Sequence, residues 1–325
     1  MPDHIELDIA IARYPHTAPL LDGEVRIEGV RPNFIQVIPQ IAAYRRMVRQ
    51  VEFDVCEIAP TTYIIARSYG APFIALPIFV TRRFHHSGLL VRPDAGIRHP
   101  KDLEGRKVGV RAYSVTTGVW TRGILIDEYG LNSSAVTWVV DDEEHVTQLK
   151  LPPNVVQATE GRSLADMMAS GDLSAGFDAN AGIGRSGSPT GGAWQQVQAN
   201  YPELFSNAEE LEAAWHKKTG IYPMHGTIVI KDEMLKAHPW LAQSLFDAFS
   251  GAKALWLTRL MSGEASAASD KKYRQLSKIV GADPLPFGMK QNLATIKALE
   301  DAAFKQKLTP RRMRAEELFV DPEQS

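Results

Sequence analysis

Short hydrophobic runs alternate with amphipathic stretches along the first part of the chain. Alternation of apolar and polar residues predicts a strand over 7–13, which ends at the proline-bounded loop 14–19. The same pattern predicts further strands within 25–38, at 54–58 and at 73–80, with helices at 39–50 and 61–69. Strands that alternate with helices predict an α/β fold with a largely parallel sheet, in which ligands bind at the carboxyl ends of the strands.

The alternation returns after Ser87, which predicts a second sheet. The remaining expected strands are at 108–110, 136–140, 175–178 and 221–230, and the remaining helices at 114–129, 163–170, 236–261, 271–280, 289–305 and 310–318. Residues 180–192 are rich in glycine and predict a mobile loop. This loop lacks a GxGxxG order after a strand and a GK[ST] ending, so we expect no nucleotide site there.

Composition places the chain among ordinary globular proteins. It has 325 residues, 44% of them hydrophobic, which is enough for one large or two medium domains. Lysine and arginine total 36 against 38 acidic residues, and the net charge of −2 gives no basic field to hold nucleic acid or an anionic membrane. The single cysteine, Cys56, excludes an internal disulfide and lies in an apolar run, where we expect a buried, unreactive thiol.

The amino terminus carries no export signal. Residues 1–10 have no positive n-region, no long apolar stretch and no small-residue cleavage site. No apolar run approaches the ~20 residues that a membrane helix needs. We therefore expect a cytoplasmic protein with no membrane partner, which weighs against a transport receptor. The oligomeric state is left open, and a homo-oligomer is among the states that the sequence allows.

Cationic and hydroxyl side chains gather beside predicted strand ends and helix starts. Arg82 and Arg83 follow a strand, and neighbouring side chains of an extended segment point to opposite faces, so only one of the two is expected to reach a cleft. Guanidinium groups bind carboxylates through paired hydrogen bonds, and the N–H groups of a helix start favour anions. The hydroxyls are explained equally well as helix caps. The candidate ligands of a small anion are Arg82, Arg83, Arg111, Thr61, Ser114 and Thr116.

Three histidines are candidates for proton transfer. His86 and His225 lie in segments where the chain is expected to cross between two lobes, and His16 lies in the loop after the first strand. His85 and His86 point to opposite faces, so this pair cannot chelate one metal ion. The chain has no HExxH, CxxC or comparable spacing, so we expect no metal, although the three histidines could converge on Zn or Mn. Asp178, which ends a strand, is a candidate base or hinge hydrogen-bonding residue.

Several segments carry a resemblance to a known family. The runs TRRFHHS, KDLEGRKVGV, VWTRGILIDEYG, TGIYPMHGTIVI and HPWLAQSLFDAF resemble those of the 4,5-dihydroxyphthalate decarboxylase family. The resemblance covers most of the chain, from Asp54 to Phe249, and RRFHHS with YPMH is its most specific part. In the family an acidic residue and a glutamine lie near the position of Ala112–Ser114, and an arginine stands at His85. The substrate is therefore less firmly implied than the fold.

The resemblance implies the two-lobed fold of the type 2 periplasmic binding proteins, with a cleft between the lobes. We expect lobe 1 to combine residues 1–85 with 228–325, and lobe 2 to hold residues 86–227. The resemblance also implies cofactor-free decarboxylation of 4,5-dihydroxyphthalate to 3,4-dihydroxybenzoate and CO2. Two alternatives stay open: a non-catalytic solute-binding protein for an aromatic or small carboxylate, and a decarboxylase of the same fold that acts on a different aromatic acid.

The expected chemistry assigns roles to these residues. A hydroxyl para to the departing carboxylate can push electrons into the ring, so that the carbon bearing the carboxylate accepts a proton and CO2 leaves. His86 and His225 are expected to be the acid and the base, in an order that the sequence leaves open. Arg82 or Arg83, together with Arg111, is expected to hold carboxylate. The rest of the expected substrate site is Ser114, Thr116, Thr61, His16 and Asp178.

Overall fold

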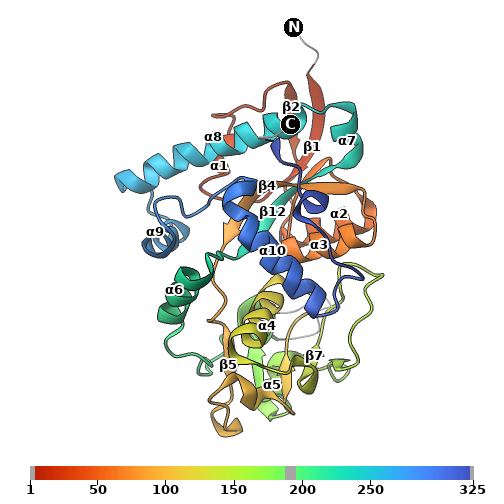
Figure 1. The fold of residues 1–325 in the computed structure, drawn as a ribbon, viewed down its shortest axis with the longest axis vertical. Helices are drawn as coiled ribbons and strands as arrows, with labels where there is room; N and C mark the ends of the chain where they lie inside the picture. Colours follow the sequence, from red (N-terminus) through yellow and green to blue (C-terminus); the bar gives the residue numbers. More distant parts are fainter. Residues whose placement is uncertain (1–3, 187–194, 323–325) are drawn as a thin grey trace. The chain divides into compact units, whose positions relative to one another are not determined.

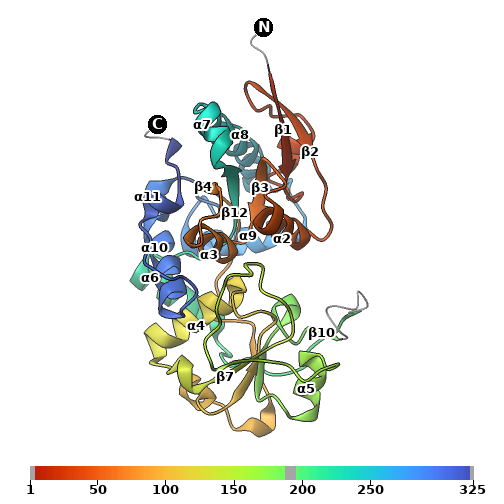
Figure 2. The same ribbon diagram turned by 90° about the vertical axis from the view of Figure 1, so that its right-hand side faces the viewer.

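The chain divides into two compact units, and both are mixtures of helices and strands (Figures 1 and 2). We describe residues 4–186 and 195–322 of a computed structural model. Unit 1 comprises Met1–Arg83, Thr219–Ala298 and Arg311–Ser325, and unit 2 comprises Phe84–Lys218 and Leu299–Pro310. The α/β class expected from the alternation of strands and helices is confirmed.

The boundaries of the units differ from the expected lobes at three places. The chain leaves unit 1 after Arg83 and returns after Lys218, instead of crossing at 85 and 227. Residues 224–227 belong to unit 1 because they already pair with the strand that ends at Arg82. Leu299–Pro310 belongs to unit 2, where Gln306 hydrogen-bonds with the Arg122 side chain and the carbonyl of Val119.

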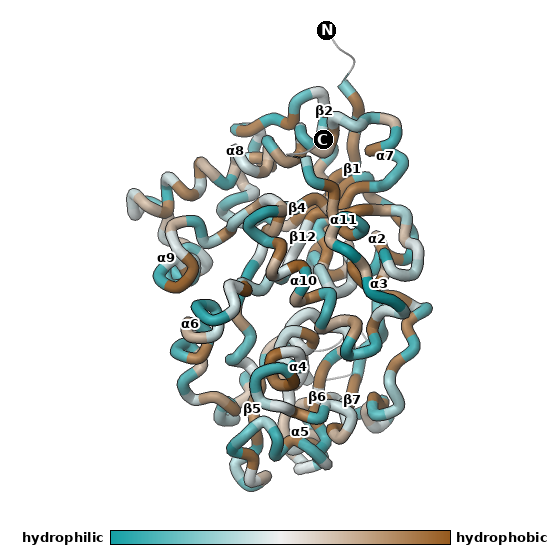
Figure 3. The backbone as a smooth tube through the Cα atoms, viewed as in Figure 1, coloured by the Kyte–Doolittle hydropathy of each residue, from teal (hydrophilic) through white to brown (hydrophobic). Residues whose placement is uncertain are grey.

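Unit 1 is built on a five-stranded sheet with the order β2-β1-β3-β12-β4. Its strands are β1 (Ile5–Ala10), β2 (Val30–Phe34), β3 (Val55–Ile58), β4 (Phe73–Arg82) and β12 (Met224–Lys231). β1 pairs in parallel with β2 and β3, whereas β12 runs antiparallel to both β3 and β4. The carboxyl ends of β1, β2, β3 and β4 therefore lie at the same edge as the amino end of β12. Figure 3 shows the hydrophobic character of the central strands, which are almost wholly buried.

The helices of unit 1 cover this sheet. They are α1 (Ala18–Leu21), α2 (Ile41–Gln50), α3 (Pro60–Ser68), α7 (Asp232–Ala237), α8 (Leu241–Ser262), α9 (Ala268–Val280), α11 (Ala315–Leu318) and the first part of α10 (Met289–Lys305). α2 packs against β3, α3 against β12 and β4, and α8 against β4 and α1. The single helix expected over 236–261 is wrong: Pro239 cannot continue the hydrogen-bond ladder of α7, and α8 begins two residues later. The helix expected over 310–318 is limited to α11.

Unit 2 is built on a second five-stranded sheet, with the order β5-β9-β6-β7-β8. Its strands are β5 (Leu89–Val91), β6 (Lys107–Gly109), β7 (Thr137–Val140), β8 (Val155–Gln157) and β9 (Ala175–Phe177), and its helices are α4 (Thr116–Tyr129), α5 (Leu164–Ser170), most of α6 (Ala208–Thr219) and the end of α10. β9, β6, β7 and β8 run parallel, so their carboxyl ends share one edge, and β5 is antiparallel to β9.

Three smaller expectations concern single segments. Cys56 is buried as expected, and burial raises the pKa of its thiol well above the ordinary value. Of the glycine-rich stretch, residues 187–192 lie outside the described residues, and Arg185–Ser186 forms a short strand, β10, with β11 (Gln195–Gln196). Within 4–186 and 195–322, no helix combines the length and apolar character needed to cross a bilayer.

Candidate active site

The carboxyl edge of the unit 1 sheet collects the candidates that belong to this unit. They are His16 after β1, Thr61 after β3, Arg82 and Arg83 at the end of β4, and His225 at the start of β12. Met224 pairs with Arg82, and the N–H of Arg83 donates to the carbonyl of Pro223 at 3.4 Å. The first two residues of the RRFHHS segment therefore lie beside the YPMH segment at this edge, and the rest of RRFHHS belongs to unit 2.

Arg82 is committed to the interior of unit 1. Its guanidinium donates to the carbonyls of Tyr222 at 2.6 Å and Pro286 at 3.0 Å, and to the side-chain oxygen of Asn292. It also lies 4.7 Å from the centre of the Phe79 ring and is only 1% exposed. Burial lowers the pKa of Arg82 to about 10. These contacts fit a structural role, so Arg83 is the member of the pair that fits anion binding.

Arg83 and His225 are close enough for the charge of one to act on the other. His225 is partly buried, and desolvation lowers its pKa well below the ordinary value, with Arg83 and Lys272 acting in the same direction. Burial also lowers the pKa of the Arg83 guanidinium. An imidazole with so low a pKa is neutral at pH 7, so it has a nitrogen that can accept a proton, but its surroundings make it a weaker base than an ordinary histidine. The electrostatics of this edge therefore set the neutral form of His225 and do not assign it as acid or base.

His16 lies in a box of aromatic rings. It stacks parallel to Tyr14, with ring centres 5.2 Å apart, and contacts Trp256 at 5.3 Å and Tyr273 edge-on at 6.2 Å. The side chain is 2% exposed, and burial, the largest cause, lowers the pKa of His16 to about 4. His16 is thus a second neutral imidazole in unit 1.

Glu57 is a candidate that reasoning from the sequence missed. Its Oε1 accepts hydrogen bonds from the hydroxyls of Tyr14 at 2.7 Å and Tyr44 at 3.0 Å, and its Oε2 accepts from the N–H of Ala12 at 3.0 Å. Burial raises the pKa of this carboxyl, although the three hydrogen bonds oppose the shift. A Cβ atom at Gly226 would lie 3.3 Å from Oε1, so Glu57 lies next to the residue that follows His225. The available signal was a glutamate inside an otherwise apolar strand, where a charged group needs partners.

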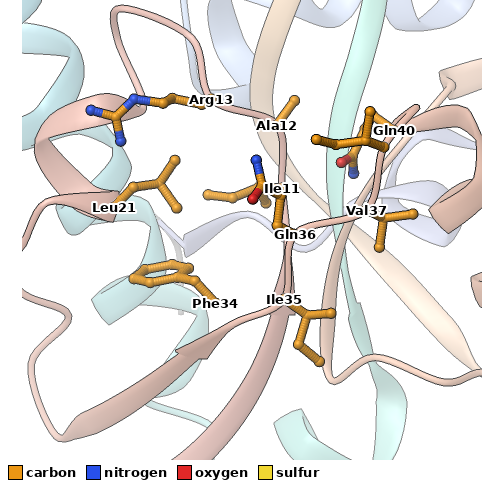
Figure 4. A pocket seen from close by; sticks show the side chains of 10 residues that line it. Ile11, Ala12, Arg13, Leu21, Phe34, Ile35, Gln36, Val37 and Gln40 are labelled. Carbon is orange, nitrogen blue, oxygen red and sulfur yellow. The ribbon is translucent and has the colours of Figure 1, made fainter.

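A pocket of about 370 Å³ opens where β1 and β2 end (Figure 4). Its polar side chains are Arg13, Gln36 and Gln40, and most of the remaining lining is apolar. Ala12 belongs both to the pocket and to the donors of Glu57, so the pocket adjoins the buried carboxylate. This volume falls in the range of small-molecule sites and suffices for a substituted aromatic ring.

His86 belongs to unit 2 and lies among aromatic side chains. Trp215 meets its ring edge-on at 5.5 Å and Phe205 at 6.2 Å, while Glu212 accepts a hydrogen bond from its backbone N–H at 3.3 Å. The side chain is 3% exposed, and burial lowers the pKa of His86 to about 4. His85 lies instead beside Trp120, with its ring nearly parallel at 6.5 Å. Because His86 is neutral at pH 7, it must gain a proton before it can act as an acid.

The loop just before α4 holds a carboxylate of the protein itself. Oε1 of Glu144 accepts the N–H groups of Tyr113 at 2.7 Å and Ser114 at 3.3 Å, and Oε2 accepts the hydroxyl of Ser114. Arg111 pairs with Asp142 at 2.9 Å. Two of the expected ligand-binding residues are thus engaged by the acidic run 141–144, which reasoning from the sequence missed. The signal was the position of this run, directly after a predicted strand.

The remaining candidates occupy different environments. Thr61 and Thr116 are buried in the first turns of α3 and α4, but the N-cap residues are Ala59 and Val115, so the expected capping role is wrong at these positions. Asp178 is exposed at the end of β9. Among residues 4–186 and 195–322, no group of three or more His, Cys, Asp or Glu side chains is arranged to hold a metal ion.

Two α/β units, each with polar candidates at the carboxyl edge of its sheet, define a protein with the periplasmic-binding-protein fold. The aliphatic sulphonate binding protein SsuA of Escherichia coli matches with a TM-score of 0.54 and 12% identity, over 99% of this chain and 93% of that chain. The desulfurization enzyme DSZB matches with a TM-score of 0.51 and 14% identity, over 97% and 96%. The family described as "ABC transporter, phosphonate, periplasmic substrate-binding protein" matches residues 28–173. The expected fold is confirmed, and at these identities the likeness shows the fold alone.

Curated relatives narrow the class. The 4,5-dihydroxyphthalate decarboxylase of Comamonas testosteroni is 31% identical over 97% of this chain and 96% of its own length. The 4,5-dihydroxyphthalate decarboxylase of Pseudomonas putida is 38% identical over 53% of this chain and 69% of its own length. The chain belongs to the 4,5-dihydroxyphthalate decarboxylase family. It is accordingly an enzyme of the carboxy-lyase class, as the resemblance implied.

Proposed function

We propose that this enzyme converts 4,5-dihydroxyphthalate to 3,4-dihydroxybenzoate and CO2 and needs no cofactor. The observation that carries the proposal is that Arg82 and Arg83 lie beside the YPMH segment at one sheet edge, where the charge of Arg83 helps to lower the pKa of His225. The relatives named 4,5-dihydroxyphthalate decarboxylase supply the substrate class. A location in the cytoplasm remains part of the proposal.

The reaction requires proton transfer and no redox step. A neutral imidazole removes the proton of the hydroxyl para to the leaving carboxylate, and the electron pair of that oxygen moves into the ring. The ring carbon that bears the carboxylate takes up a proton. The bond from this carbon to the carboxylate then breaks, its electrons restore the aromatic ring, and CO2 leaves. Solvent returns the phenolic proton, so one proton is consumed in each turnover.

The histidines provide the proton carriers in this scheme. Burial keeps His225 and His86 neutral at pH 7, so each imidazole is in the form that accepts the phenolic proton, although the lowered pKa makes it a weaker base than an ordinary histidine. An imidazolium whose pKa lies far below 6.5 is a stronger acid than usual, so a proton gained from the phenol is passed on readily. His86 and His225 are therefore the proposed acid and base, and their order stays open.

Arg83 is the proposed ligand of the carboxylate that stays on the ring. A guanidinium can bind both carboxylate oxygens at once, which fixes the ring while the other carboxylate loses its water. The remaining proposed contacts of the substrate are Arg111, Ser114, Thr116, Thr61, His16 and Asp178.

The decisive experiment is an assay of the purified chain after dialysis against a chelator. With 4,5-dihydroxyphthalate as the only addition, we expect release of CO2 and formation of 3,4-dihydroxybenzoate, measured by chromatography. His225→Ala and His86→Ala should each lower kcat by about 10²- to 10⁴-fold, because each removes a proton carrier, and should leave the Kd for phthalate largely unchanged. His4→Ala, a change at an exposed histidine, is the matched control.

Two other outcomes would replace the proposal. Stoichiometric binding of the dicarboxylate without CO2 release would identify a solute-binding protein, and the histidine changes would then act on affinity alone. Activity that is lost on chelation and restored by one divalent metal would keep the reaction but require a metal-assisted mechanism.

A further inference from the structure

The acidic run Asp141–Glu144 follows β7. Its side chains pair with arginines and backbone N–H groups at the carboxyl edge of the unit 2 sheet. Its pairs are Asp141 with Arg185, Asp142 with Arg111, and Glu144 with the N–H groups of Tyr113 and Ser114. β6 and β7 are parallel neighbours, so the segments that follow them meet at this edge. The run therefore covers the place where an anionic ligand of a parallel sheet would bind.

Glu144 makes the contacts that a ligand carboxylate would make. Its two oxygens accept two backbone N–H groups and one hydroxyl, all from Tyr113 and Ser114 in the loop that precedes the N-cap of α4, Val115. Ser114 is only 6% exposed, so its contact with Glu144 lies in the interior of unit 2 and not on the surface. The geometry of the residues around Glu144 is a complete subsite for one carboxylate.

A buried cation, Arg122, also stabilises a negative charge in this subsite. Arg122 is 0% exposed, its guanidinium lies 4.0 Å from the centre of the Tyr113 ring, and its charge acts on Glu144. Within the described parts of the chain, Nη1 of Arg122 has no hydrogen-bond partner. A fully buried arginine is costly unless a negative charge lies nearby, so the subsite is built to hold an anion whether or not Glu144 occupies it.

The attachment of the run identifies Glu144 as its movable member. The backbone N–H groups of Asp141 and Asp142 both donate to the carbonyl of Arg111, which anchors the first half of the run to unit 2. Glu144 lies further along, in the irregular segment between β7 and β8, and is held at α4 through its side chain. His145 and Val146, which follow Glu144, are buried, so the change that releases the subsite is a rotation of the Glu144 side chain, which leaves the strands in place.

We propose that Glu144 stands in for the substrate, occupying the carboxylate subsite of unit 2 when no ligand is bound, and that a carboxylate of the substrate displaces it. The proposal rests on the proposed function for the ligand, an aromatic dicarboxylate. Because Glu144 and the ligand compete for the same N–H groups, the measured affinity is lower than that of the open subsite. Every tenfold difference between these two affinities corresponds to about 1.4 kcal/mol needed to displace Glu144.

Phthalate is the probe, because it carries both carboxylates but lacks the hydroxyl needed for decarboxylation. Its Kd is measured by titration calorimetry on the full chain with Glu144→Gln and, as a matched control, Glu143→Gln, which removes one charge from the same run at an exposed position. Loss of the competing charge should tighten binding about tenfold in Glu144→Gln, while Glu143→Gln should stay within about twofold of the wild type. Unchanged or weaker binding in Glu144→Gln would overturn the proposal, as would phthalate that binds none of the three proteins.

A second measurement needs no variant and covers the case in which Glu144→Gln fails to fold. Amide hydrogen exchange of residues 141–149 in the wild type should become faster when phthalate binds, because the displaced Glu144 side chain no longer ties this segment to Tyr113 and Ser114. Slower or unchanged exchange with saturating phthalate would contradict displacement. CO2 release from 4,5-dihydroxyphthalate is scored separately, so loss of the proposed function and loss of this proposal are distinguished.

Discussion

Replacement of Arg82 by methionine tests whether this buried guanidinium stabilises unit 1. The group donates to three acceptors from separate parts of the chain: the carbonyl of Tyr222 before β12, the carbonyl of Pro286 before α10, and the side chain of Asn292 within α10. Methionine fills much of the same space but has no donor. The acceptors would then stay buried without this partner.

The magnitude follows from these contacts. The side-chain oxygen of Asn292 loses its donor, which costs about 1–3 kcal/mol. The carbonyls of Tyr222 and Pro286 keep the hydroxyl of Thr295 and the amide of Asn292 as donors, so each loses about 0.5–1.5 kcal/mol. Loss of the contact with the Phe79 ring adds about 0.5–2 kcal/mol. Removal of a desolvated cation returns several kcal/mol and offsets part of this loss. We expect the free energy of unfolding to fall by about 2–4 kcal/mol, and the melting temperature by roughly 4–16 °C at about 2–4 °C for each kcal/mol.

Urea unfolding followed by tryptophan fluorescence measures this change. Arg31→Met is the matched control, because the ion pair of Arg31 with Glu6 is about three-quarters exposed on both sides and should contribute less than about 1 kcal/mol. An Arg82→Met protein that unfolds within about 0.5 kcal/mol of Arg31→Met would refute the structural role of Arg82.

Three further predictions concern the unit 1 edge. Arg83→Lys should weaken phthalate binding by about 10- to 100-fold in calorimetry, because a forked pair contributes about 1.5–3 kcal/mol, and equal, small effects of Arg83→Lys and Arg82→Lys would mean that neither arginine holds carboxylate. Tyr14→Phe and Tyr44→Phe should each lower the free energy of unfolding by about 1 kcal/mol. Because both hydroxyls donate to Glu57, the double variant should show a coupling energy of at least ~0.5 kcal/mol, and additive losses would count against this shared acceptor. The folded-state pKa of His16, about 4, lies below the unfolded value of about 6.5, so its contribution is fully present above pH 6.5 and is lost as pH falls toward 4. This amounts to about 2 kcal/mol between pH 7 and pH 5, and His16→Phe should remove that share of the pH dependence of unfolding.

Most of the secondary structure could be predicted from the sequence, because alternation, helical spacing and breakers act over a few residues. α10 has the predicted bounds, and β3 and β7 begin within one residue of theirs. The errors also have local causes. Pro239 divides the expected long helix, and the segment 310–314 does not continue into α11. The unit boundaries were less accessible, since only the pairing of Met224 with Arg82 assigns the start of β12 to unit 1.

The sequence by itself determined which residue types stand at strand ends and the family, and it predicted the class of ligand. Only the tertiary structure decided what each of these side chains faces. Arg82 and Arg83 are equivalent in the sequence, but Arg82 meets carbonyls that lie far along the chain, whereas Arg83 lies within reach of His225. Glu57 and Glu144 also became candidates only through their partners in space. Glu57 accepts the hydroxyls of Tyr14 and Tyr44, and Glu144 accepts N–H groups just before α4. Burial, hydrogen bonding and pKa depend on neighbours in space, and no local pattern encodes which distant segments those neighbours come from.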